Sequence, residues 1–427
     1  MRNGITRRRF IGTTAAGVAL VGTSLPRTSF GAEKTLKIGF LAPLTGEVAG
    51  WGLPGLNGLE IWADEINAGG GIQAGGDTYM VELVPYDDEY LADKALRGAK
   101  KLVLEDGVGL IMMLGGSDAP AAVDFFTKNK VVSSTLLPSD LTDETLYHMA
   151  PCEVHPIYNV TGVEWLAENR PELKTAAICA QDDELGRPSV ATYLAAFEAA
   201  GIEVVYQEFF AIDTVDFAPV ITSMLATKPD ILCLDTAYPD FVNFLTEQAF
   251  LQGFDGQIIS CTFDFYPAVI EKVGTEFVEG FVFQFPDFDD PALNEPHINF
   301  PNPNGFFTAY EERYPGTWSA VSWEYAAIAV QWKAAVEKAG SVDPMAVFEA
   351  MKAGGRAPHV FGDANWWGTE LFGIDNALVG DWPVVQIQNG KAVIVEYKSI
   401  IDWWAKHKDL MIKHFEALGE MWYQRKA

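Results

Sequence analysis

The residues of this chain that could carry out chemistry form only incomplete motifs. Residues 50–55 (GWGLPG) match the G-x-G-x-x-G spacing of a dinucleotide-binding loop. That loop must follow directly on a strand, so that the next helix begins beneath a pyrophosphate. Here five residues separate Leu44 from the first glycine, and a tryptophan and a proline crowd the run. The spacing argues against a nucleotide site, and the run Gly69–Gly71 is expected to end a helix.

The usual signatures of hydrolases and metalloenzymes do not occur in the sequence. It has neither a G-x-x-x-x-G-K-[ST] phosphate loop nor a G-x-S-x-G serine elbow. The six histidines show no H-E-x-x-H pattern or clustered spacing, and we expect them to be surface residues rather than ligands. The acidic pairs Asp87-Asp88 and Asp182-Asp183 follow expected strands, where acids more often cap helices or hold hinges than exchange protons. We therefore predict no enzyme, no cofactor and no metal site.

Composition and charge exclude several classes of function. The chain has 427 residues, with 58 Asp and Glu against 30 Lys and Arg, and a formal net charge of −28. Nucleic acid or an anionic bilayer would repel such a surface. Hydrophobic residues make up 49% of the chain, which rules out a disordered or fibrous protein. The length exceeds one ordinary core of roughly 100–200 residues, so we expect two lobes.

The N-terminal segment 1–32 has the pattern of a secretory signal. Arginines at positions 7–9 precede an apolar run that extends to about Leu20, and small residues then lead to Ala32. The apolar run is shorter than the roughly 20 residues that cross a bilayer, which favours a cleaved signal over an anchor. The paired arginines are typical of signals read by the twin-arginine translocase. We predict export to a periplasm, and cleavage would remove five arginines and change the net charge from −28 to −33.

The four cysteines are expected to be buried thiols. Cys179, Cys233 and Cys261 lie in apolar runs with the character of buried strands, and Cys152 is the fourth. No C-x-x-C pair occurs, which excludes a redox motif or zinc ribbon. An oxidising compartment permits disulfides, so a bridge remains the alternative.

Short β-rich runs alternate with amphipathic helical stretches along the chain. Apolar runs at 36–44 and 109–114 predict buried strands with helices between them, and a second series begins near Lys174. This alternation predicts parallel sheets covered on both faces. Late helices followed by late strands indicate that the chain revisits both lobes before a last helix from Ile400 to Trp422. Trp366-Trp367 and Trp403-Trp404 are expected to pack the lobes or the tail.

The order of these motifs resembles one known family. LKIGFLAPLTGEVAGWG, GLEIWADEINAGGGI and VELVPYDDEYLADKA follow one another as at the start of type I periplasmic solute-binding proteins of the leucine/isoleucine/valine-binding family, which serve branched-chain amino acid ABC transporters. The similarity continues through LIMMLGGSDAPAAVDF, the turn QDDELGR and the stretch YPDFVNFLTEQAFLQGF. It covers essentially the whole chain after the signal. It implies an α/β fold of two Rossmann-like, doubly wound lobes joined by three hinge crossings (periplasmic binding protein-like I), which close around a ligand.

The resemblance also implies domain boundaries and partners. Lobe 1 is expected over 33–152 plus about 285–360, lobe 2 over 153–284 plus about 361–400, and a C-terminal helix over 401–427. The implied function is the extracytoplasmic solute-binding component of an ABC importer, with a small-molecule ligand and the membrane subunits of an ABC permease as partners. A ligand-sensing module of the same fold that feeds a signalling partner is the alternative. An enzyme with two α/β lobes is a second rival.

The family's ligand positions carry over to this chain one by one. The resemblance implies contacts from an aromatic ring after the first strand, from a small-residue turn after the third strand, and from groups at the ends of later strands. These positions are Trp51, Gly115, Gly116, Ser117, Leu137, Ser139, Tyr238, Thr262 and Asp264.

Two departures from the family pattern concern the charge of the ligand. Gly115 stands where a serine hydroxyl commonly holds the ligand carboxylate, although backbone N–H groups of the turn still favour an anion. Thr262 stands where an acid pairs with the ligand ammonium, and Asp264 lies two residues further on. A buried ammonium without a partner is costly. The sequence therefore favours a carboxylate, an amide or an aromatic compound without an amine, and a branched-chain amino acid remains open.

Overall fold

The computed structural model describes residues 34–46, 48–235 and 239–425. The predicted signal segment and Tyr238 lie outside the described residues. Residues from Lys34 onward form one compact unit with two large sheets and one small sheet. No helix in the described part of the chain is both long and apolar enough to cross a membrane.

The first large sheet has six strands in the order β2-β3-β1-β4-β5-β6. They are β1 (Lys34–Ala42), β2 (Ile72–Ala74), β3 (Asp77–Asp87), β4 (Leu110–Met113), β5 (Ser133–Ser134) and β6 (His148–Met149). Each pairs in parallel with its neighbour except β2, which pairs antiparallel with β3. The helices associated with this sheet are α1 (Ala49–Ala68), α2 (Ala92–Lys101), α3 (Ala119–Asn129), α10 (Pro303–Arg313), α11 (Val321–Ala339) and α12 (Pro344–Lys352). We refer to this sheet and its helices as the first lobe.

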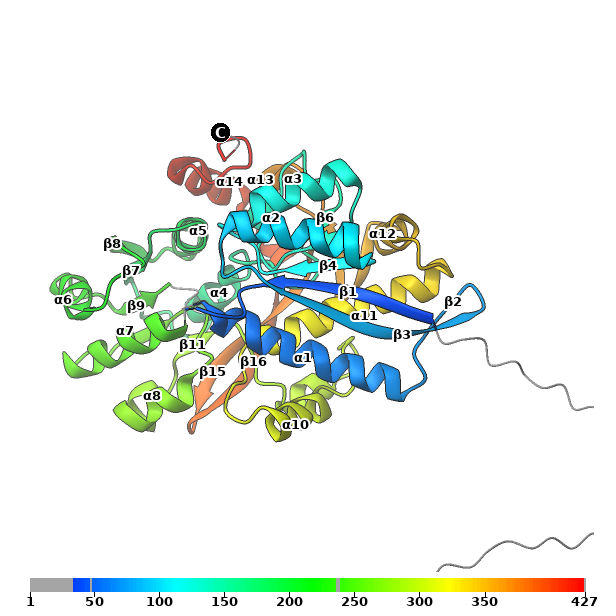
Figure 1. Ribbon diagram of the computed structural model, residues 1–427. Coiled ribbons are helices and arrows are strands. Elements are labelled where there is room, and N and C mark those ends of the chain that lie inside the picture. Colours follow the sequence, from blue (N-terminus) through cyan, green and yellow to red (C-terminus); the bar gives the residue numbers. More distant parts are fainter. Residues whose placement is uncertain (1–33, 47, 236–238, 426–427) are drawn as a thin grey trace, which may run out of the picture. The chain divides into compact units, whose positions relative to one another are not determined.

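Helices cover both faces of the first sheet, which explains its unbroken apolar strands. Ile111 and Met113 of β4 belong to the core beneath α2 and α3, whereas Met112 belongs to the core beneath α1 and α11. Successive side chains of a strand point to opposite faces, so a strand buried on both sides has no polar positions. Figure 1 shows α1 and α11 on one side of β1 and β3.

The second large sheet has seven strands in the order β16-β15-β11-β10-β9-β7-β8. They are β7 (Thr175–Gln181), β8 (Glu203–Phe210), β9 (Ile231–Leu234), β10 (Gln257–Ile259), β11 (Val282–Phe283), β15 (Asp381–Gln388) and β16 (Lys391–Ser399). The first five are parallel, and β15 and β16 add an antiparallel edge. The helices of this second lobe are α4 (Asn159–Asn169), α5 (Gly186–Ala200), α6 (Ala218–Ala226), α7 (Pro239–Leu251), α8 (Tyr266–Val273), α9 (Thr275–Val278) and α14 (Ile400–Leu418).

The chain passes between the two sheets three times. It leaves the first sheet after β6, returns after β11 to form α10 and α11, and leaves again before β15. Between the last two passages, β12 (Arg356–His359), β13 (Gly362–Trp367) and β14 (Ala377–Val379) form a three-stranded sheet that also contains the short helix α13 (Thr369–Phe372) in its β13–β14 connection. Ala377 of this small sheet bridges to Ala150, directly after β6. The two-lobed α/β fold with interleaved lobes is confirmed, while the exact lobe boundaries stay a prediction.

The glycines of the GWGLPG run lie inside helix α1 rather than in a phosphate-binding loop. A Cβ atom at Gly52 would lie 1.8 Å from the carbonyl oxygen of Pro43, and one at Gly58 would lie 1.7 Å from that of Ser322 in α11. Glycine therefore allows α1 to approach its neighbours closely. The helix ends as predicted, because the N–H of Gly71 donates to the carbonyl of Ile66 at 2.9 Å.

Several side-chain predictions can be checked against the packing. All four cysteines are buried thiols that form no disulfide, as expected. Trp367 packs edge-on against Trp404 with ring centroids 4.8 Å apart, which confirms that these tryptophans pack the tail. The histidine prediction is wrong for His148, His155 and His359, which are only 1–2% exposed.

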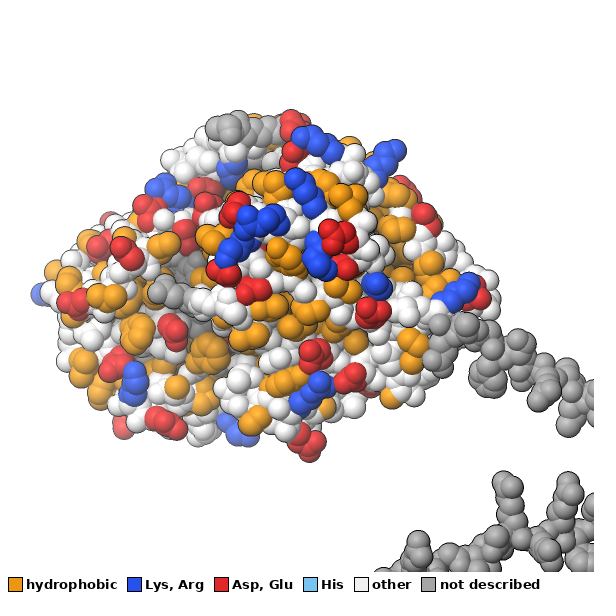
Figure 2. All heavy atoms as spheres, viewed as in Figure 1, with side chains coloured by type: hydrophobic (Ala, Val, Ile, Leu, Met, Phe, Trp, Pro, Cys, Tyr) orange, Lys and Arg blue, Asp and Glu red, His pale blue; other side chains and the backbone are white. Residues whose placement is uncertain are grey.

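The visible surface offers no separate basic patch. Basic side chains gather over α2 and α3 in Figure 2, but acidic side chains lie beside them. The ion pairs there are Lys94–Glu89, Arg97–Asp93, Lys101–Asp106 and Lys128–Asp124. Neutralised pairs of this kind do not attract a phosphate backbone.

Candidate ligand-binding site

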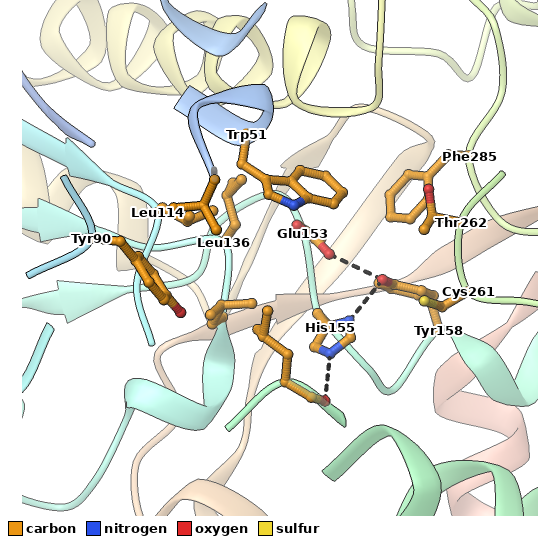
Figure 3. A pocket seen from close by; sticks show the side chains of 13 residues that line it. Trp51, Tyr90, Leu114, Leu136, Glu153, His155, Tyr158, Cys261, Thr262 and Phe285 are labelled. Atoms are coloured by element: carbon orange, nitrogen blue, oxygen red, sulfur yellow. Dashed lines mark hydrogen bonds between the residues drawn. The ribbon is translucent and has the colours of Figure 1, made fainter. Parts of the chain in front are cut away.

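A pocket with an empty volume of about 470 Å³ lies where strands from both lobes end (Figure 3). Its thirteen lining residues are Val48, Trp51, Tyr90, Leu114, Leu136, Leu137, Glu153, His155, Tyr158, Leu185, Cys261, Thr262 and Phe285. Leu114 follows β4, Leu136 follows β5, and Cys261 follows β10. Carboxyl ends of parallel strands are where open α/β sheets bind ligands.

Aromatic side chains form the wall of the pocket on the side of the hinge. The ring of Tyr158 stacks on Trp382 with centroids 4.9 Å apart, and Phe285 packs edge-on against Tyr158 at 5.1 Å. Each of these three residues lies in or beside a different passage between the lobes. Trp51 comes from the first turn of α1 in the first lobe. The hinge thus contributes a packed aromatic surface to a site that both lobes share.

A chain of hydrogen bonds connects the acidic and basic groups of the pocket (Figure 3). Glu153 Oε1 lies 3.1 Å from the hydroxyl of Tyr158, and that hydroxyl lies 3.0 Å from Nδ1 of His155. Nε2 of His155 lies 3.1 Å from the carbonyl oxygen of Leu185. All three side chains are buried, so each contact forms in a medium of low dielectric constant.

The ionisation of these groups is shifted by their burial. Burial raises the pKa of Glu153 to about 8, although hydrogen bonds from Tyr158 and Glu324 oppose the rise. Glu324 interacts directly with Glu153, and burial together with the charges of Glu153 and Asp264 raises its pKa well above the usual range. Burial lowers the pKa of His155 to about 4. At neutral pH the imidazole is therefore uncharged and Glu153 is protonated.

The protonation state decides which atom donates in each contact. The carbonyl of Leu185 can only accept, so Nε2 of a neutral His155 carries its proton and Nδ1 must accept. The hydroxyl of Tyr158 lies within hydrogen-bond distance of both Nδ1 of His155 and Oε1 of Glu153, and it donates to Glu153. Burial raises the pKa of Glu153 and so favours the neutral form of its carboxyl group.

The turn after β4, expected to bind an anion, has its N–H groups already engaged. The N–H of Gly116 donates to both carboxylate oxygens of Asp140, at 3.0 and 3.2 Å, and the hydroxyl of Thr135 donates to the same carboxylate at 2.8 Å. The N–H of Ser117 lies 3.4 Å from the Tyr90 hydroxyl. A carboxylate of the chain itself therefore lies where a ligand carboxylate was expected.

The carboxylate of Asp140 leaves no room for a side chain at Gly115. Gly115 has a φ of +98°, and a Cβ atom there would lie 2.1 Å from Asp140 Oδ2 and 2.2 Å from the hydroxyl oxygen of Thr135. A serine at this position, the residue whose hydroxyl commonly holds the ligand in the family pattern, would collide with Asp140. The departure at Gly115 thus has a physical cause.

The structure brings together only some of the predicted site residues. Trp51, Leu137 and Thr262 line the pocket. A neighbouring hollow is lined by Gly116, Ser117 and Ser139. Gly115 directly precedes Gly116 in the same turn. The hydroxyl of Ser117 donates at 2.9 Å to Glu184 of the second lobe.

Two further predicted residues are not part of the pocket lining. Asp264 lies outside it and accepts the backbone N–H of Ala320 at 3.0 Å. Tyr238 lies outside the described residues.

Sequence reasoning missed the residues of the hinge. Glu153, His155 and Phe285 lie in the first and second passages between lobes, where no strand-end motif marks them. Tyr158 is the residue immediately before α4. The available signal was the run CEVHP, in which an acid and a histidine interrupt an otherwise apolar passage directly after β6.

The chain was compared with known proteins. A family model described as periplasmic binding protein matches residues 35–392. The Leu/Ile/Val-binding protein BraC3 of Rhizobium johnstonii is 27% identical over 355 residues, which cover 78% of this chain and 88% of that protein.

Two solved structures illustrate the fold similarity. The leucine-binding protein LivK of Thermotoga maritima superposes with a TM-score of 0.69 at 20% identity, covering 86% of this chain and 100% of that one. An R. palustris solute-binding protein in complex with 4-hydroxybenzoate superposes with a TM-score of 0.67 at 18% identity, covering 86% and 97%. With the family match over most of its length, the chain belongs to the periplasmic binding protein family, a family of solute-binding proteins.

Proposed function

We propose that this chain is the extracytoplasmic solute-binding component of an ABC importer and that it encloses a small organic molecule between its lobes. The pocket supports this proposal, because its lining comes from the first lobe, the second lobe and the passages between them. A membrane permease would be the partner that accepts the ligand.

The mechanism that we propose is closure of the two lobes, driven by a ligand that makes more contacts in the closed state than in the open state. Trp51 belongs to the first lobe and Thr262 to the second, so a molecule between them contacts both only when the lobes are together. A ligand can shift an equilibrium only by the difference in its affinity for the two states. The hinge residues Tyr158 and Phe285 form part of the same pocket, which places the bound molecule directly against the segments that bend.

The lining favours a ligand with an apolar or aromatic body. Four of the lining residues are leucines. Four more are tryptophan, tyrosine or phenylalanine, namely Trp51, Tyr90, Tyr158 and Phe285. The name of the Rhizobium relative points to branched-chain amino acids, and the R. palustris neighbour holds an aromatic acid. Both ligand bodies fit a pocket of this character.

We also propose that the protein acts outside the cytoplasm after export by the twin-arginine route, and that it is a receptor rather than an enzyme. Export is supported by the family and by the arginines at positions 7–9 ahead of an apolar run. The receptor role is supported by the family match, because the family consists of solute-binding proteins.

A thermal-shift experiment with the chain lacking residues 1–32 tests the binding function. Branched-chain amino acids, benzoates, benzylamine and amides would be screened, and a binder at a hundred times its Kd should add about 2.7 kcal/mol to the free energy of unfolding. Trp51→Ala should weaken the best binder at least tenfold, since it removes one wall. The control is Phe244→Ala, which truncates an aromatic side chain that is 45% exposed and outside the pocket. Equal losses in both variants would contradict the site.

A further inference from the structure

We infer that the pocket takes a ligand with a cationic nitrogen and no carboxylate, an organic amine or ammonium compound, and that the carboxyl pair of Glu153 and Glu324 receives this nitrogen. The inference rests on the proposed function and specifies the ligand of the same pocket. It reverses the expectation from sequence. That expectation was that the chain has the family's site for a ligand carboxylate but lacks the family's site for a ligand ammonium.

The carboxyl groups around the pocket have no cationic partner among the described residues. Glu153, Glu324 and Asp264 are 7%, 0% and 9% exposed, and no lysine, arginine or histidine in the described ranges forms an ion pair with them. Neither carboxyl oxygen of Glu324 receives a hydrogen bond from an N–H or hydroxyl group in that part of the chain. Buried carboxylates normally have such partners, because leaving one uncompensated costs several kcal/mol.

Glu153 is the member of this group that reaches the cavity. Figure 3 shows its carboxyl group between the indole of Trp51 and the hydroxyl of Tyr158. Its carboxyl group contacts the hydroxyl of Tyr158 and the carboxyl group of Glu324, and neither of these partners carries a positive charge. Faces and edges of Trp51, Tyr158 and Phe285 surround the space in front of it. Aromatic rings beside a carboxylate are a favourable environment for an alkylammonium group.

At the turn after β4, the groups expected to hold a ligand carboxylate are already engaged. Asp140 accepts from Gly116 and Thr135, and Ser117 donates its hydroxyl to Glu184. A carboxylate brought to this turn would have to displace Asp140 from the N–H of Gly116. An acid or a zwitterion is therefore disfavoured where a simple cation is not.

Binding of a cation should expel a proton. In the empty pocket Glu153 carries a proton; when the ammonium binds, the O–H bond of the carboxylic acid breaks and its proton leaves to the buffer. The carboxylate that remains pairs with the ligand cation. The net charge of the pocket is therefore unchanged, because the cation replaces the proton. The titratable groups that face Glu153 carry no positive charge at neutral pH; they are Cys152, His155, Tyr158, Cys261, Asp264, Glu324 and Tyr325.

The test uses two matched sets of probes on the chain lacking residues 1–32. The first set shares an isobutyl body: 3-methylbutylamine, leucine and 4-methylpentanoate. The second shares a phenyl ring: benzylamine, benzamide and benzoate. Calorimetry at neutral pH in phosphate and in Tris separates proton release from binding heat. We expect the amine of at least one set to bind ten or more times tighter than its acid and to release between half a proton and one proton.

Two variants connect the result to the carboxyl pair. Glu153→Gln should weaken the amine at least tenfold and reduce proton release, and Glu324→Gln should do the same if the first variant does not fold. The control Glu276→Gln changes an exposed acid on α9 that does not line the pocket and should leave both quantities unchanged.

The outcomes separate this inference from the receptor function. Tighter binding of leucine, benzoate or 4-methylpentanoate than of the matched amines, unaffected by Glu153→Gln, overturns the cation site and leaves the receptor standing. Benzamide binding as well as benzylamine without proton release overturns it in favour of a neutral amide. If no compound of either set or of the wider screen stabilises a protein with a native circular dichroism spectrum, the proposed function fails together with the inference.

Discussion

The turn at Gly115–Ser117 and the hinge at Glu153 treat charge in opposite ways. In the turn, backbone donors that could bind an anion are bonded to Asp140. In the hinge, acidic groups that could bind a cation have only one another and a tyrosine. Residue types alone suggest an anion site at the turn and no cation site. The difference teaches that what a pocket can bind depends on which of its polar groups the protein leaves unpaired.

The largest expected effect comes from restoring the family's serine in the turn. Gly115→Ser places a side chain at a φ of +98° and 2.1 Å from the Asp140 carboxylate, so we expect a loss of about 3 kcal/mol in the free energy of unfolding. Urea denaturation measures it. In a double-mutant cycle, Asp140→Ala should recover a third or more of the loss, because it removes one colliding group. Fully additive effects would show that the two positions do not compete for the same space.

An effect of intermediate size per pH unit is expected from pH acting on the hinge. The pKa of Glu153 is about 8 in the folded chain against 4.5 as a reference for the unfolded chain, so the folded state holds a proton that the unfolded state has lost between these values. Its contribution to stability is present in full below about pH 4.5 and is lost as pH rises through about 8, by at most about 1.4 kcal/mol per pH unit.

The measurement for this effect is urea denaturation of the ligand-free protein from about pH 5 to about pH 9. The profile of Glu153→Gln should be flatter than that of the wild type over this range. Asp140 and Asp264, whose pKa values burial also raises, titrate in both proteins and drop out of the difference. Parallel profiles would mean that Glu153 ionises normally and that the hinge is not distinct from the turn.

The smallest effect is expected from Ser117. Its hydroxyl joins the lobes through Glu184 at 2.9 Å in an exposed position, so Ser117→Ala should change stability by about 0.5 kcal/mol. It should weaken amine and carboxylate probes by the same factor of two or less, because it acts on closure. A selective loss for carboxylate probes in calorimetry would instead show that Ser117 holds the ligand and that the turn is an anion site.

The sequence was sufficient for features that depend on local patterns. Unbroken apolar runs predicted the parallel strands, and Gly69–Gly71 predicted the end of α1. The two-lobed fold and the contribution of Trp51 to a pocket followed from the resemblance. Leu137 and Thr262 also line the pocket, and their contact with a ligand stays a prediction.

The remaining features depend on tertiary contacts that no local pattern records. Asp140 reaches a turn that lies 24 residues earlier in the chain, and only the folded sheet brings the two together. Glu153 and Glu324 meet because the first passage between the lobes runs beside the start of α11. The departures from the family pattern at Gly115 and Thr262 were visible in the sequence. Their consequences depended on contacts with distant residues, which the sequence could not reveal.

The four buried thiols have a consequence for how this protein matures. No disulfide joins Cys152, Cys179, Cys233 or Cys261, so the fold contains no covalent cross-link between these residues. The chain can therefore reach the same final state in a reducing or an oxidising compartment. Folding could be complete before the protein leaves the cytoplasm, as a transport route that carries folded cargo requires. Under the proposed export, the mature fold then requires no disulfide to form after delivery.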